Sequence, residues 1–492
     1  MARLDEIKKE RLKKIEELRK LGINPYPYSY AKKNNCEEII KKFSKIKAGE
    51  ETKINVNLAG RIINLRQLGK IAFANLQDDS GRLQIVLRED ILKNKFDFFK
   101  KYIDTGDFLG IEGRVIKTKT GELSVLANKF EILSKAILPL PEKWHGLKNI
   151  EERYRMRYVD LIVNRETKKI FVTRTKIINA IREFLNSEGF VEVETPSLQL
   201  VYGGAEARPF ITELHDLHMK VYLSISPELY LKRLLIGDFE KVYTICKNFR
   251  NEGIDRTHNP EFTMLECYQA YADYNDMTKL YEEIWSYVLD KLEKGKEIEY
   301  QGQKINFKRW QRVTMYEGLK KYAQIDVKKA STKELLEKAK ALVLDVDEKT
   351  PRGLIIAELA KKLVEPKLIQ PTHFVDHPKE TTPLCKLKRD DPELIERNEP
   401  FIAGMEVGNI YSELNDPELQ RKYFEEQAEF LKKKGLAHPY DKDFLNALSY
   451  GMPPAGGLGL GIDRMVMILT NQHSIQDVIL FPFMKLQEEQ RR

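Results

Sequence analysis

A strand–loop–strand pattern over residues 241–268 constrains the fold of this chain more than any other stretch. The run KVYTICKNF is rich in β-branched and aromatic residues, as strands are, and Arg250 follows its end. After a polar loop, the run EFTMLECY alternates with a period of two residues, so Phe262, Glu266 and Tyr268 share one face. The opposite face is small and apolar, which suits packing. Packing does not require an aromatic ring, a carboxylate and a phenol beside an arginine, so we interpret their face as the floor of a site.

The same pattern would also fit an amphipathic sheet surface with solvated charges. The exact order of the residues decides between the two interpretations. FRNEG followed at a short distance by HNPEFT resembles motif 2 of the class II aminoacyl-tRNA synthetases, especially their lysyl-specific branch. The later string GMPPAGGLGLGIDRMVMIL resembles motif 3 of that family. In it, Gly457, Gly459 and Gly461 alternate on one strand face and leave the backbone open to a flat ligand, and Arg464 follows at the start of a helix.

Length and composition predict two or three domains and no membrane segment. The 492 residues, of which 42% are hydrophobic, can bury a large core. No apolar run approaches membrane length, and the charged N-terminus MARLDEIKKERLKKIEELRK is unlike a secretory signal, so we expect a cytoplasmic protein. The four cysteines form no CxxC pair, which indicates neither a disulfide framework nor a structural zinc site.

The net charge of +8 is concentrated in the N-terminal third of the chain. Residues 1–150 contain 31 Lys and Arg against 20 Asp and Glu, whereas the remaining residues contain 52 against 55. A polyanion is therefore expected to bind first to the N-terminal third. A basic amphipathic helix is predicted over residues 3–21. It could be a solvated surface helix, or it could bind the backbone of a nucleic acid.

Five short strands predict an OB-fold β-barrel over residues 53–136, after a basic helical extension over 1–52. The turns DDSG and KTGE separate the second strand from the third and the fourth from the fifth, and a helix-like segment lies between the third and the fourth. The strands are INVNLAGRI, KIAFANLQD, RLQIVL, FLGIEGRVIK and ELSVLANKFEIL.

The outward face of this barrel is a candidate for binding bases. Small apolar residues form one face of KIAFANLQD, so Phe73 points the other way, as does Gln84 on the next strand. A phenylalanine among polar side chains can stack on a splayed base, although it could instead lie under a loop. The stretch resembles the anticodon-binding domain of the class IIb synthetases, which implies Arg66, Phe73 and Gln84 as anticodon contacts.

A linker over residues 137–160 leads to a predicted catalytic domain over 161–492. A helical pattern capped by Gly189, followed by a strand that stops at Pro196, resembles motif 1, which builds the dimer interface in the family. The same residues would also fit an ordinary buried helix and strand with no role in dimerisation. Residues 270–365 are rich in Lys and Glu, and we interpret them mainly as peripheral helices inserted between halves of the catalytic sheet. The resemblance implies an α+β domain with a mixed, mostly antiparallel sheet.

Two segments upstream of motif 2 carry further candidates. GGAEARPF lacks the P-loop pattern and matches a family loop beside the amino-acid pocket, here with Gly204. In SISPELYLKRLL, Pro227 suits the first helical turn, and the helix dipole alone would favour Glu228 beside it. The family places a carboxylate for the substrate amine at this position.

The segment FIAGMEVGNIYSELN concentrates acids on one predicted strand. Strict alternation puts Glu406 on the face opposite to Asn409 and Glu413, so Gly408 must mark a bulge or bend if all of them face the site. A solvated edge strand would explain one or two of these acids. In the lysyl branch the corresponding acids divide between ATP-bound magnesium, here Glu399 and Glu406, and lysine, here Glu413.

The resemblance covers about residues 50–482 and implies a class IIb lysyl-tRNA synthetase. Such an enzyme is expected to activate L-lysine with ATP and Mg²⁺ to lysyl-adenylate, to transfer the lysyl group to the 3′ end of tRNA(Lys), and to form a homodimer. Arg250 and Arg464 are the implied catalytic residues. The implied ATP site comprises Arg250, Glu252, His258, Asn259, Phe262, Glu406, Gly461 and Arg464. The implied lysine site comprises Gly204, Glu228, Glu266, Tyr268, Asn409, Tyr411 and Glu413.

Two alternatives stay open. An aspartyl- or asparaginyl-tRNA synthetase would share both domains, but its pocket needs cationic groups rather than three glutamates. A non-enzymatic tRNA-binding paralogue would keep the barrel and lose the arginines of the motifs, which this chain retains.

Overall fold

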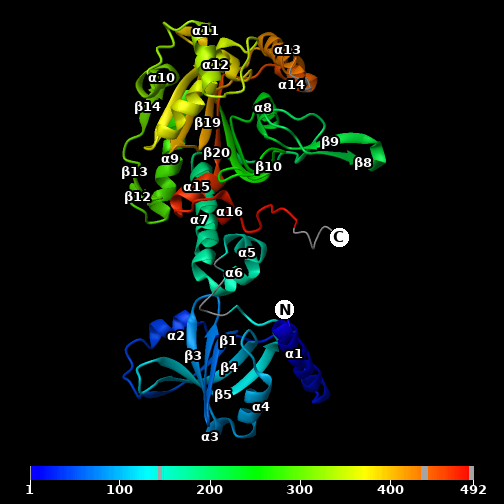
Figure 1. Cartoon of the computed structure of the whole chain (residues 1–492), viewed down its shortest axis with the longest axis vertical. Coiled ribbons are helices and arrows are strands. Elements are labelled where there is room, and N and C mark those ends of the chain that lie inside the picture. Colours follow the sequence, from blue (N-terminus) through cyan, green and yellow to red (C-terminus); the bar gives the residue numbers. More distant parts are fainter. Residues whose placement is uncertain (1, 142–146, 148, 434–440, 487–492) are drawn as a thin grey trace. The chain divides into compact units, whose positions relative to one another are not determined.

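The computed structural model describes residues 2–141, 147, 149–433 and 441–486 (Figure 1). The chain divides into two compact units, Met1–Lys148 and Asn149–Arg492. The division falls inside the linker predicted over 137–160. Within the described residues, no helix is long and apolar enough to cross a membrane.

The first unit is built on a closed five-stranded barrel, as predicted for an OB-fold. Its strands hydrogen-bond in the order β1-β2-β3-β5-β4. Helices α3 (Glu89–Leu92) and α4 (Asn94–Tyr102) lie between the third and fourth strands in sequence. The strands are β1 (Glu51–Leu68), β2 (Ile71–Gln77), β3 (Arg82–Arg88), β4 (Phe108–Lys117) and β5 (Leu123–Ser134).

Two N-terminal helices, α1 (Ala2–Lys20) and α2 (Cys36–Lys42), pack on this barrel. Leu18 and Ile39 are buried in the same hydrophobic core as the barrel strands. Arg11 is also buried, and its guanidinium donates hydrogen bonds to backbone carbonyls that include those of Thr105 and Ala136. The basic extension predicted over 1–52 is therefore held against the barrel by apolar packing and by a buried arginine.

The second unit is built on a ten-stranded mixed sheet. Its main path runs β14-β15-β17-β19-β20-β11-β10-β6, and neighbours are antiparallel except for β14 with β15 and β10 with β6. This confirms the predicted mixed, mostly antiparallel sheet. The strands of the path are β14 (Gln311–Thr314), β15 (Thr372–Pro378), β17 (Asp391–Ile402), β19 (Gly408–Ser412), β20 (Ala455–Gly461), β11 (Glu261–Ala270), β10 (Lys241–Phe249) and β6 (Val191–Glu192); β16 (Leu387–Lys388) and β18 (Met405–Glu406) pair with β17.

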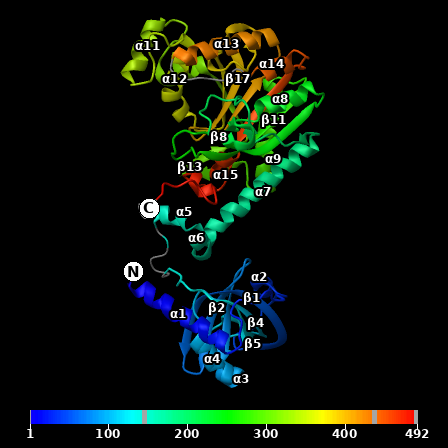
Figure 2. The same ribbon diagram turned by 90° about the vertical axis from the view of Figure 1, so that its right-hand side faces the viewer.

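One face of this sheet packs on helices α7 (Arg165–Ser187), α9 (Tyr274–Lys291) and α15 (Ile462–Leu469) (Figure 2). Leu265 and Cys267 of β11 are fully buried in that core, on the small apolar face that the period of two predicted. Helix α7 ends at Ser187, and Gly189 follows two residues later with a φ of 83°, a conformation that favours glycine, as expected after a helix C-terminus. Because Trp285 and Tyr281 of α9 are also fully buried, the start of the 270–365 stretch is a core element, whereas the sequence predicted peripheral helices.

Smaller elements surround the sheet. A three-stranded sheet in the order β7-β9-β8 and the β12–β13 hairpin complete the β-structure. Their bounds are β7 (Leu198–Gln199), β8 (Ile211–Leu214), β9 (Met219–Leu223), β12 (Glu297–Tyr300) and β13 (Gln303–Asn306). The other helices are α5 (Ile150–Arg155), α6 (Arg157–Val163), α8 (Glu228–Ile236), α10 (Met315–Ala323), α11 (Thr332–Ala341), α12 (Arg352–Leu363), α13 (Pro417–Lys433), α14 (Lys442–Leu448), α16 (Ile475–Val478), η1 (His215–Leu217), η2 (Glu365–Lys367) and η3 (Lys379–Thr381).

Candidate active site

A cavity of about 540 Å³ lies over the face of the sheet that α7 and α9 leave open. Strands β11, β19 and β20 contribute residues to its lining, and α8 and the loop after β10 contribute others. The lining includes every residue that the sequence analysis assigned to lysine, ATP or magnesium. The structure thus brings together residues that lie more than 250 positions apart in the chain.

The floor of the cavity is bare because two glycines of β20 lie between larger residues of its neighbours. Gly457 is in register with Tyr268 on one side and Tyr411 on the other, and Gly459 lies between Glu266 and Asn409. A Cβ atom added at Gly457 would lie 2.1 Å from Oε1 of Glu413 and 2.4 Å from the ring of Tyr268. Gly457 therefore makes room for the Glu413 carboxylate and the Tyr268 ring, and the approach of a flat ligand to the backbone of β20 stays a prediction.

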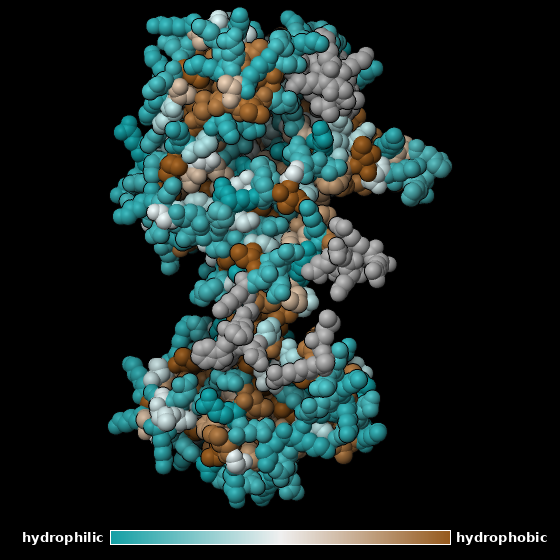
Figure 3. Space-filling view, in the orientation of Figure 1, coloured by the Kyte–Doolittle hydropathy of each residue, from teal (hydrophilic) through white to brown (hydrophobic). Residues whose placement is uncertain are grey.

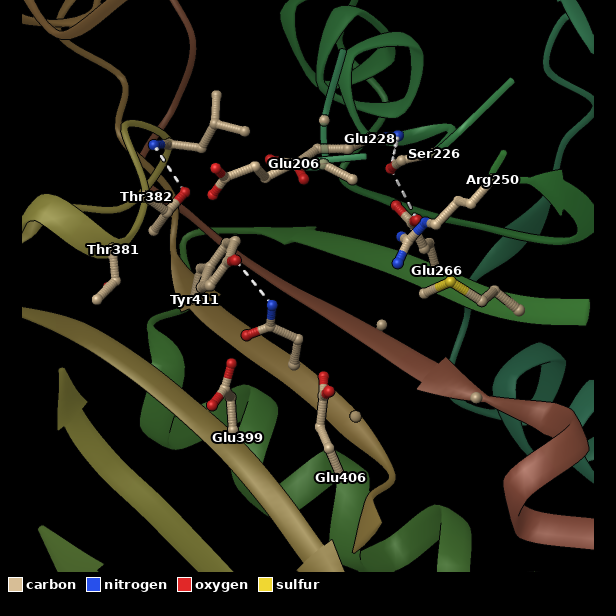
Figure 4. Close-up of a pocket in the computed structure, with 18 of the residues that line it drawn as sticks. Glu206, Ser226, Glu228, Arg250, Glu266, Thr381, Thr382, Glu399, Glu406 and Tyr411 are labelled. Atoms are coloured by element: carbon tan, nitrogen blue, oxygen red, sulfur yellow. Dashed lines mark hydrogen bonds between the residues drawn. The ribbon is translucent and has the colours of Figure 1, made fainter. Parts of the chain in front are cut away.

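Three glutamates, Glu228, Glu266 and Glu413, converge at what we call the glutamate end of the cavity. Each is at least 95% buried, so each carboxylate is largely removed from water. Ser226 donates a hydrogen bond of 2.9 Å to Oε1 of Glu266, and the Tyr268 hydroxyl lies 3.2 Å from Oε2. Burial, together with the neighbouring Glu228 carboxylate, raises the pKa of Glu266 to about 8. Figure 4 shows Ser226 between Glu228 and Glu266.

A fourth charged residue at this end, Lys232, was missed by the sequence analysis. Its fully buried Nζ lies 2.6 Å from Oε1 of Glu228 and 2.5 Å from Oε2 of Glu413. Burial lowers the pKa of Lys232, but the attraction of Glu228 and Glu413 outweighs it, so its pKa lies above the ordinary lysine value. In sequence, Glu228 and Lys232 look like a surface pair spaced i, i+4, and only the fold shows that the helix face is buried.

The acidic segment bends where the sequence required it. Strand β18 ends at Glu406, β19 begins at Gly408, and Val407 between them belongs to neither strand. A Cβ atom at Gly408 would lie 2.7 Å from the ring of Tyr281 and 2.8 Å from the carbonyl oxygen of Gly459, so this approach needs glycine. The break allows Glu406 to line the same cavity as Glu413.

Asn409 has a fixed side chain in the wall of the cavity. Its Nδ2 donates a hydrogen bond of 2.7 Å to the Tyr411 hydroxyl, and its Oδ1 accepts one of 3.2 Å from Nε of Arg397. Arg397 was not among the predicted residues; it also pairs with Glu399. These bonds determine which way the Asn409 amide points.

Nitrogen-bearing side chains line the part of the cavity that we call the arginine end and define by Arg250, His258 and Arg464. Arg250 borders the glutamate end, where its charge acts on Glu266. The guanidinium of Arg250 lies 5.0 Å from the Phe262 ring centre, and its Nε is buried without a hydrogen-bond partner among the described residues. Nη2 of Arg464 lies 3.3 Å from Nε2 of His258, whose Nδ1 faces Asp255 at 2.8 Å. If Nε2 accepts from Arg464, the Nδ1 proton points toward Asp255.

The remaining residues predicted for ATP and the amino acid also line the cavity. Glu252 is exposed at its mouth, whereas Asn259 is buried and its Oδ1 lacks a hydrogen-bond partner within the described part of the chain. Gly461 precedes α15, the helix that carries Arg464. Gly204 has a φ of 83°, and a Cβ there would lie 2.9 Å from the Ser226 hydroxyl, so both its backbone and its surroundings favour glycine.

Glu399 and Glu406 direct their carboxylates into the cavity from β17 and β18, across from Glu206 and Glu228 (Figure 4). The described residues contain no group of three or more His, Cys, Asp or Glu side chains that could hold a metal. Two carboxylates nevertheless fit Mg²⁺, because this ion keeps several waters and is usually bound by one or two carboxylates together with substrate phosphates. The donor set is thus suited to a nucleotide-bound ion.

The outer face of the barrel carries the three predicted anticodon residues. Arg66, Phe73, Val86 and Leu126 lie in register across β1, β2, β3 and β5. Arg66 is exposed, and Phe73 is half-buried against a small apolar cluster that includes Val86 and Leu126. Gln84, two residues before Val86 on β3, accepts a hydrogen bond of 2.8 Å from Ser124. Phe73 is therefore outside the barrel core, as predicted, but its ring packs against this small apolar cluster.

Comparisons with known proteins match both compact units. The family described as OB-fold nucleic acid binding domain matches residues 56–133, and tRNA synthetases class II (D, K and N) matches residues 149–485. The lysine–tRNA ligase of Pelotomaculum thermopropionicum is 50% identical, with 99% of this chain and 96% of the relative covered. Those of Carboxydothermus hydrogenoformans and Thermotoga maritima are 49% and 48% identical, each over 98% of this chain and over 98% and 96% of the relative, respectively.

Proposed function

This chain belongs to the class II tRNA synthetases (D, K and N), and we propose that it is a lysine–tRNA ligase. The observation that carries this choice of amino acid is the set of three buried glutamates at one end of the cavity. Lysine presents two ammonium groups, and buried charges require partners of the opposite sign. An aspartate or asparagine substrate would place a carboxylate or an amide against the same three glutamates, where a positively charged group is needed.

In the first reaction, the lysine carboxylate attacks the α-phosphate of ATP, a bond from carboxylate oxygen to phosphorus forms, and pyrophosphate leaves. Two anions must approach each other, so cationic groups that meet the developing charge lower the barrier. Arg250 would hold the carboxylate and the α-phosphate, while Arg464 and His258 would contact the outer phosphates. Because the substrate carboxylate is itself the nucleophile, the protein needs to supply neither a nucleophile nor a general base.

The other groups would orient the nucleotide and the amino acid. Phe262 offers a ring for the adenine, with Asn259 and Glu252 beside it, and the bare backbone at Gly461 allows the nucleotide to lie close. Gly204, Tyr268, Asn409 and Tyr411 would shape the lysine pocket. Mg²⁺ held by Glu399 and Glu406 would neutralise phosphate charge when bound.

The second reaction transfers the lysyl group to the 3′ end of tRNA(Lys), and the barrel would bind the anticodon. Phe73 would stack on a base, with Arg66 and Gln84 beside it, and the surplus of basic residues in this unit would attract the backbone. We propose a cytoplasmic location, where ribosomes consume the product.

A homodimer through the motif 1 region is part of the proposal. Strand β6 ends the main sheet, and β7, β8 and η1 follow it in sequence. This region exposes large apolar side chains (Figure 3), namely Val191, Leu198, Leu200, Ile211, Leu214 and Leu217. Exposed apolar side chains of this size support the proposal that the region is covered by a partner. Sedimentation of the purified chain tests this point, and a monomer at micromolar concentration would contradict it.

ATP–pyrophosphate exchange with each of the twenty amino acids tests the function. We expect exchange with lysine alone, followed by lysyl transfer to tRNA(Lys). Exchange with aspartate or asparagine would assign the chain to the other branches of the family. Bound tRNA without any exchange would indicate a non-enzymatic paralogue.

A further inference from the structure

Lys232 sits behind the glutamate end rather than in the lining of the cavity. Its side chain has no exposure to solvent, and its two ionic partners are residues proposed above to bind lysine. A lone buried ammonium group is costly, so two short ionic contacts are the expected compensation. The arrangement raises the question of why a lysine pocket already contains a lysine.

The two oxygens of Glu413 face in different directions. Oε2 lies 2.5 Å from Nζ of Lys232, whereas Oε1 lies over Gly457, at the place that a Cβ atom would occupy on the cavity floor. Neither oxygen has a well-directed hydrogen-bond donor among the described residues. The carboxylate is thus anchored through Oε2, while Oε1 is buried beside the cavity floor without a hydrogen-bond donor among the described residues.

Glu228 is held in a similar way. Its Oε1 accepts a hydrogen bond of 2.6 Å from Lys232, one helical turn further along α8. Its backbone N–H is bound by the Ser226 hydroxyl, which also bonds to Glu266. Lys232 therefore connects α8 with the strand end at Glu413 and fixes the separation of two carboxylates.

We propose that Lys232 is a resident cation that positions Glu228 and Glu413 for the two ammonium groups of the substrate. This inference rests on the lysine site proposed above. Without Lys232, two carboxylates would share a buried site with no cation, and one of them would take up a proton, as paired buried acids do. Lysine binding would then have to release that proton, and the affinity would fall at neutral pH.

Other groups also influence the charge of this site. Those that act on Glu228 or Glu413 are Glu266 and Tyr268 of β11, Tyr411 of β19, and Cys385 and Lys386 of the segment beside Glu413. Arg397 of β17 acts in turn on Tyr411 and Cys385. Lys232 differs from Arg397 and Lys386 because it contacts both carboxylates directly. Its removal should therefore change how many protons lysine binding releases.

The test compares Lys232→Met with the wild type in lysine-dependent ATP–pyrophosphate exchange between about pH 6 and 9. At pH 7 we expect a lysine KM raised roughly tenfold or more and an ATP KM that stays within about twofold. The slope of log KM for lysine against pH should exceed that of the wild type in magnitude by up to about one log unit per pH unit, which corresponds to the release of one additional proton. A merely structural role would lower the melting temperature without changing this slope.

Two further variants make the result specific. Lys232→Met combined with Glu413→Gln removes the pair of like charges, so it should restore the wild-type slope although the lysine KM stays high. Lys279→Met removes an exposed i, i+4 contact with Glu283 on α9 and should change neither KM nor slope. If Lys232→Met fails to fold, the double variant should fold, because Glu228 and residue 413 are then no longer a pair of buried carboxylates without a cation.

Three outcomes would overturn the inference. The first is an unchanged lysine KM and slope in Lys232→Met. The second is an equal rise of both KM values at every pH. The third is failure of both variants to fold, which would make Lys232 a packing residue. If Glu413→Gln alone leaves the lysine KM unchanged, the proposed lysine site itself is wrong, and the two failures are thus distinguishable.

Discussion

The glutamate end and the arginine end of the cavity carry opposite charges, and they differ in how far the protein itself balances those charges. At the glutamate end, Lys232 contacts two of the three acids, and burial raises the pKa of the third, Glu266, to about 8. At the arginine end, Nε of Arg250 is buried without a partner in the described part of the chain, and Arg464 contacts a histidine and Glu406.

This difference matches the charges of the proposed ligands. Free lysine has a net charge of about +1, so a pocket close to neutrality needs only a small excess of negative charge. ATP carries several negative charges and brings Mg²⁺ with it, so its site can leave arginines partly unpaired. We infer that the amino-acid site is largely organised before binding, whereas the nucleotide site is completed by its ligand.

The largest effect is expected for Arg250→Lys, at the arginine end. Lysine keeps the charge but loses the planar fork of donors, and the loss of one transition-state donor costs roughly 100- to 1,000-fold in rate. Adenylate formation, measured by ATP–pyrophosphate exchange, should fall by about that factor. Arg88→Lys is the matched control, because Arg88 makes a two-bond contact with Asp90 on the barrel surface. Near-normal exchange in Arg250→Lys would remove Arg250 from the reaction.

Next in size is Glu413→Gln, at the glutamate end. The change keeps the shape and removes the charge that faces a substrate ammonium, which should cost about 2 kcal/mol, or roughly 30-fold in lysine KM. The ATP KM should change little. Glu283→Gln, on the exposed face of α9, serves as control. A parallel rise of both KM values would show that Glu413 does not distinguish the two ends.

The pH dependence of lysine binding should be smaller over any single pH unit, approaching tenfold per unit below pH 8. The raised pKa of Glu266 means that its carboxyl is mostly protonated at pH 7, whereas the substrate ammonium favours the ionised form. Lysine binding should therefore release a proton, and its affinity should increase as the pH rises from 6 to 8. Calorimetry at pH 7 in buffers of different ionisation enthalpy measures this release. Glu266→Gln should abolish it, and a buffer-independent enthalpy in the wild type would contradict the prediction.

The same pKa shift has a consequence for stability. The carboxyl of Glu266 has an ordinary pKa of 4.5 when unfolded and about 8 when folded. Between these values the folded chain holds a proton that the unfolded chain has lost, so this group's contribution to the free energy of unfolding decreases as the pH rises from about 4.5 to 8.

The smallest effect is expected for Phe73→Ala, which lies in the other compact unit and leaves both ends of the cavity intact. Loss of a stacked base should cost at least about 1 kcal/mol of tRNA affinity, or roughly fivefold. Exchange without tRNA should not change. Because Phe73 is half-buried over Val86 and Leu126, the melting temperature must be measured on the same variant. A much lower melting temperature with normal tRNA affinity would make Phe73 a packing residue.

The sequence predicted the parts of this structure that depend on local periodicity. A period of two residues predicted the five barrel strands, the two faces of β11 and the glycine face of β20. Gly408 predicted the bend before β19. The role of Lys232 was not predictable in this way, because the packing of α8 on β10 and β11 brings Glu413 beside it, and spacing along the chain does not show this. The burial of α9 was missed for the same reason, since its exposed Lys and Glu residues hid a stripe that contains Trp285 and Tyr281.

Calorimetric titration of L-lysine and of ATP into Glu413→Gln and Arg464→Lys tests most directly whether the two ends bind different ligands. We predict that Glu413→Gln weakens lysine binding and leaves ATP binding within about twofold, and that Arg464→Lys does the reverse. Equal weakening of both ligands by either variant would contradict the division of the cavity into a glutamate end for lysine and an arginine end for ATP.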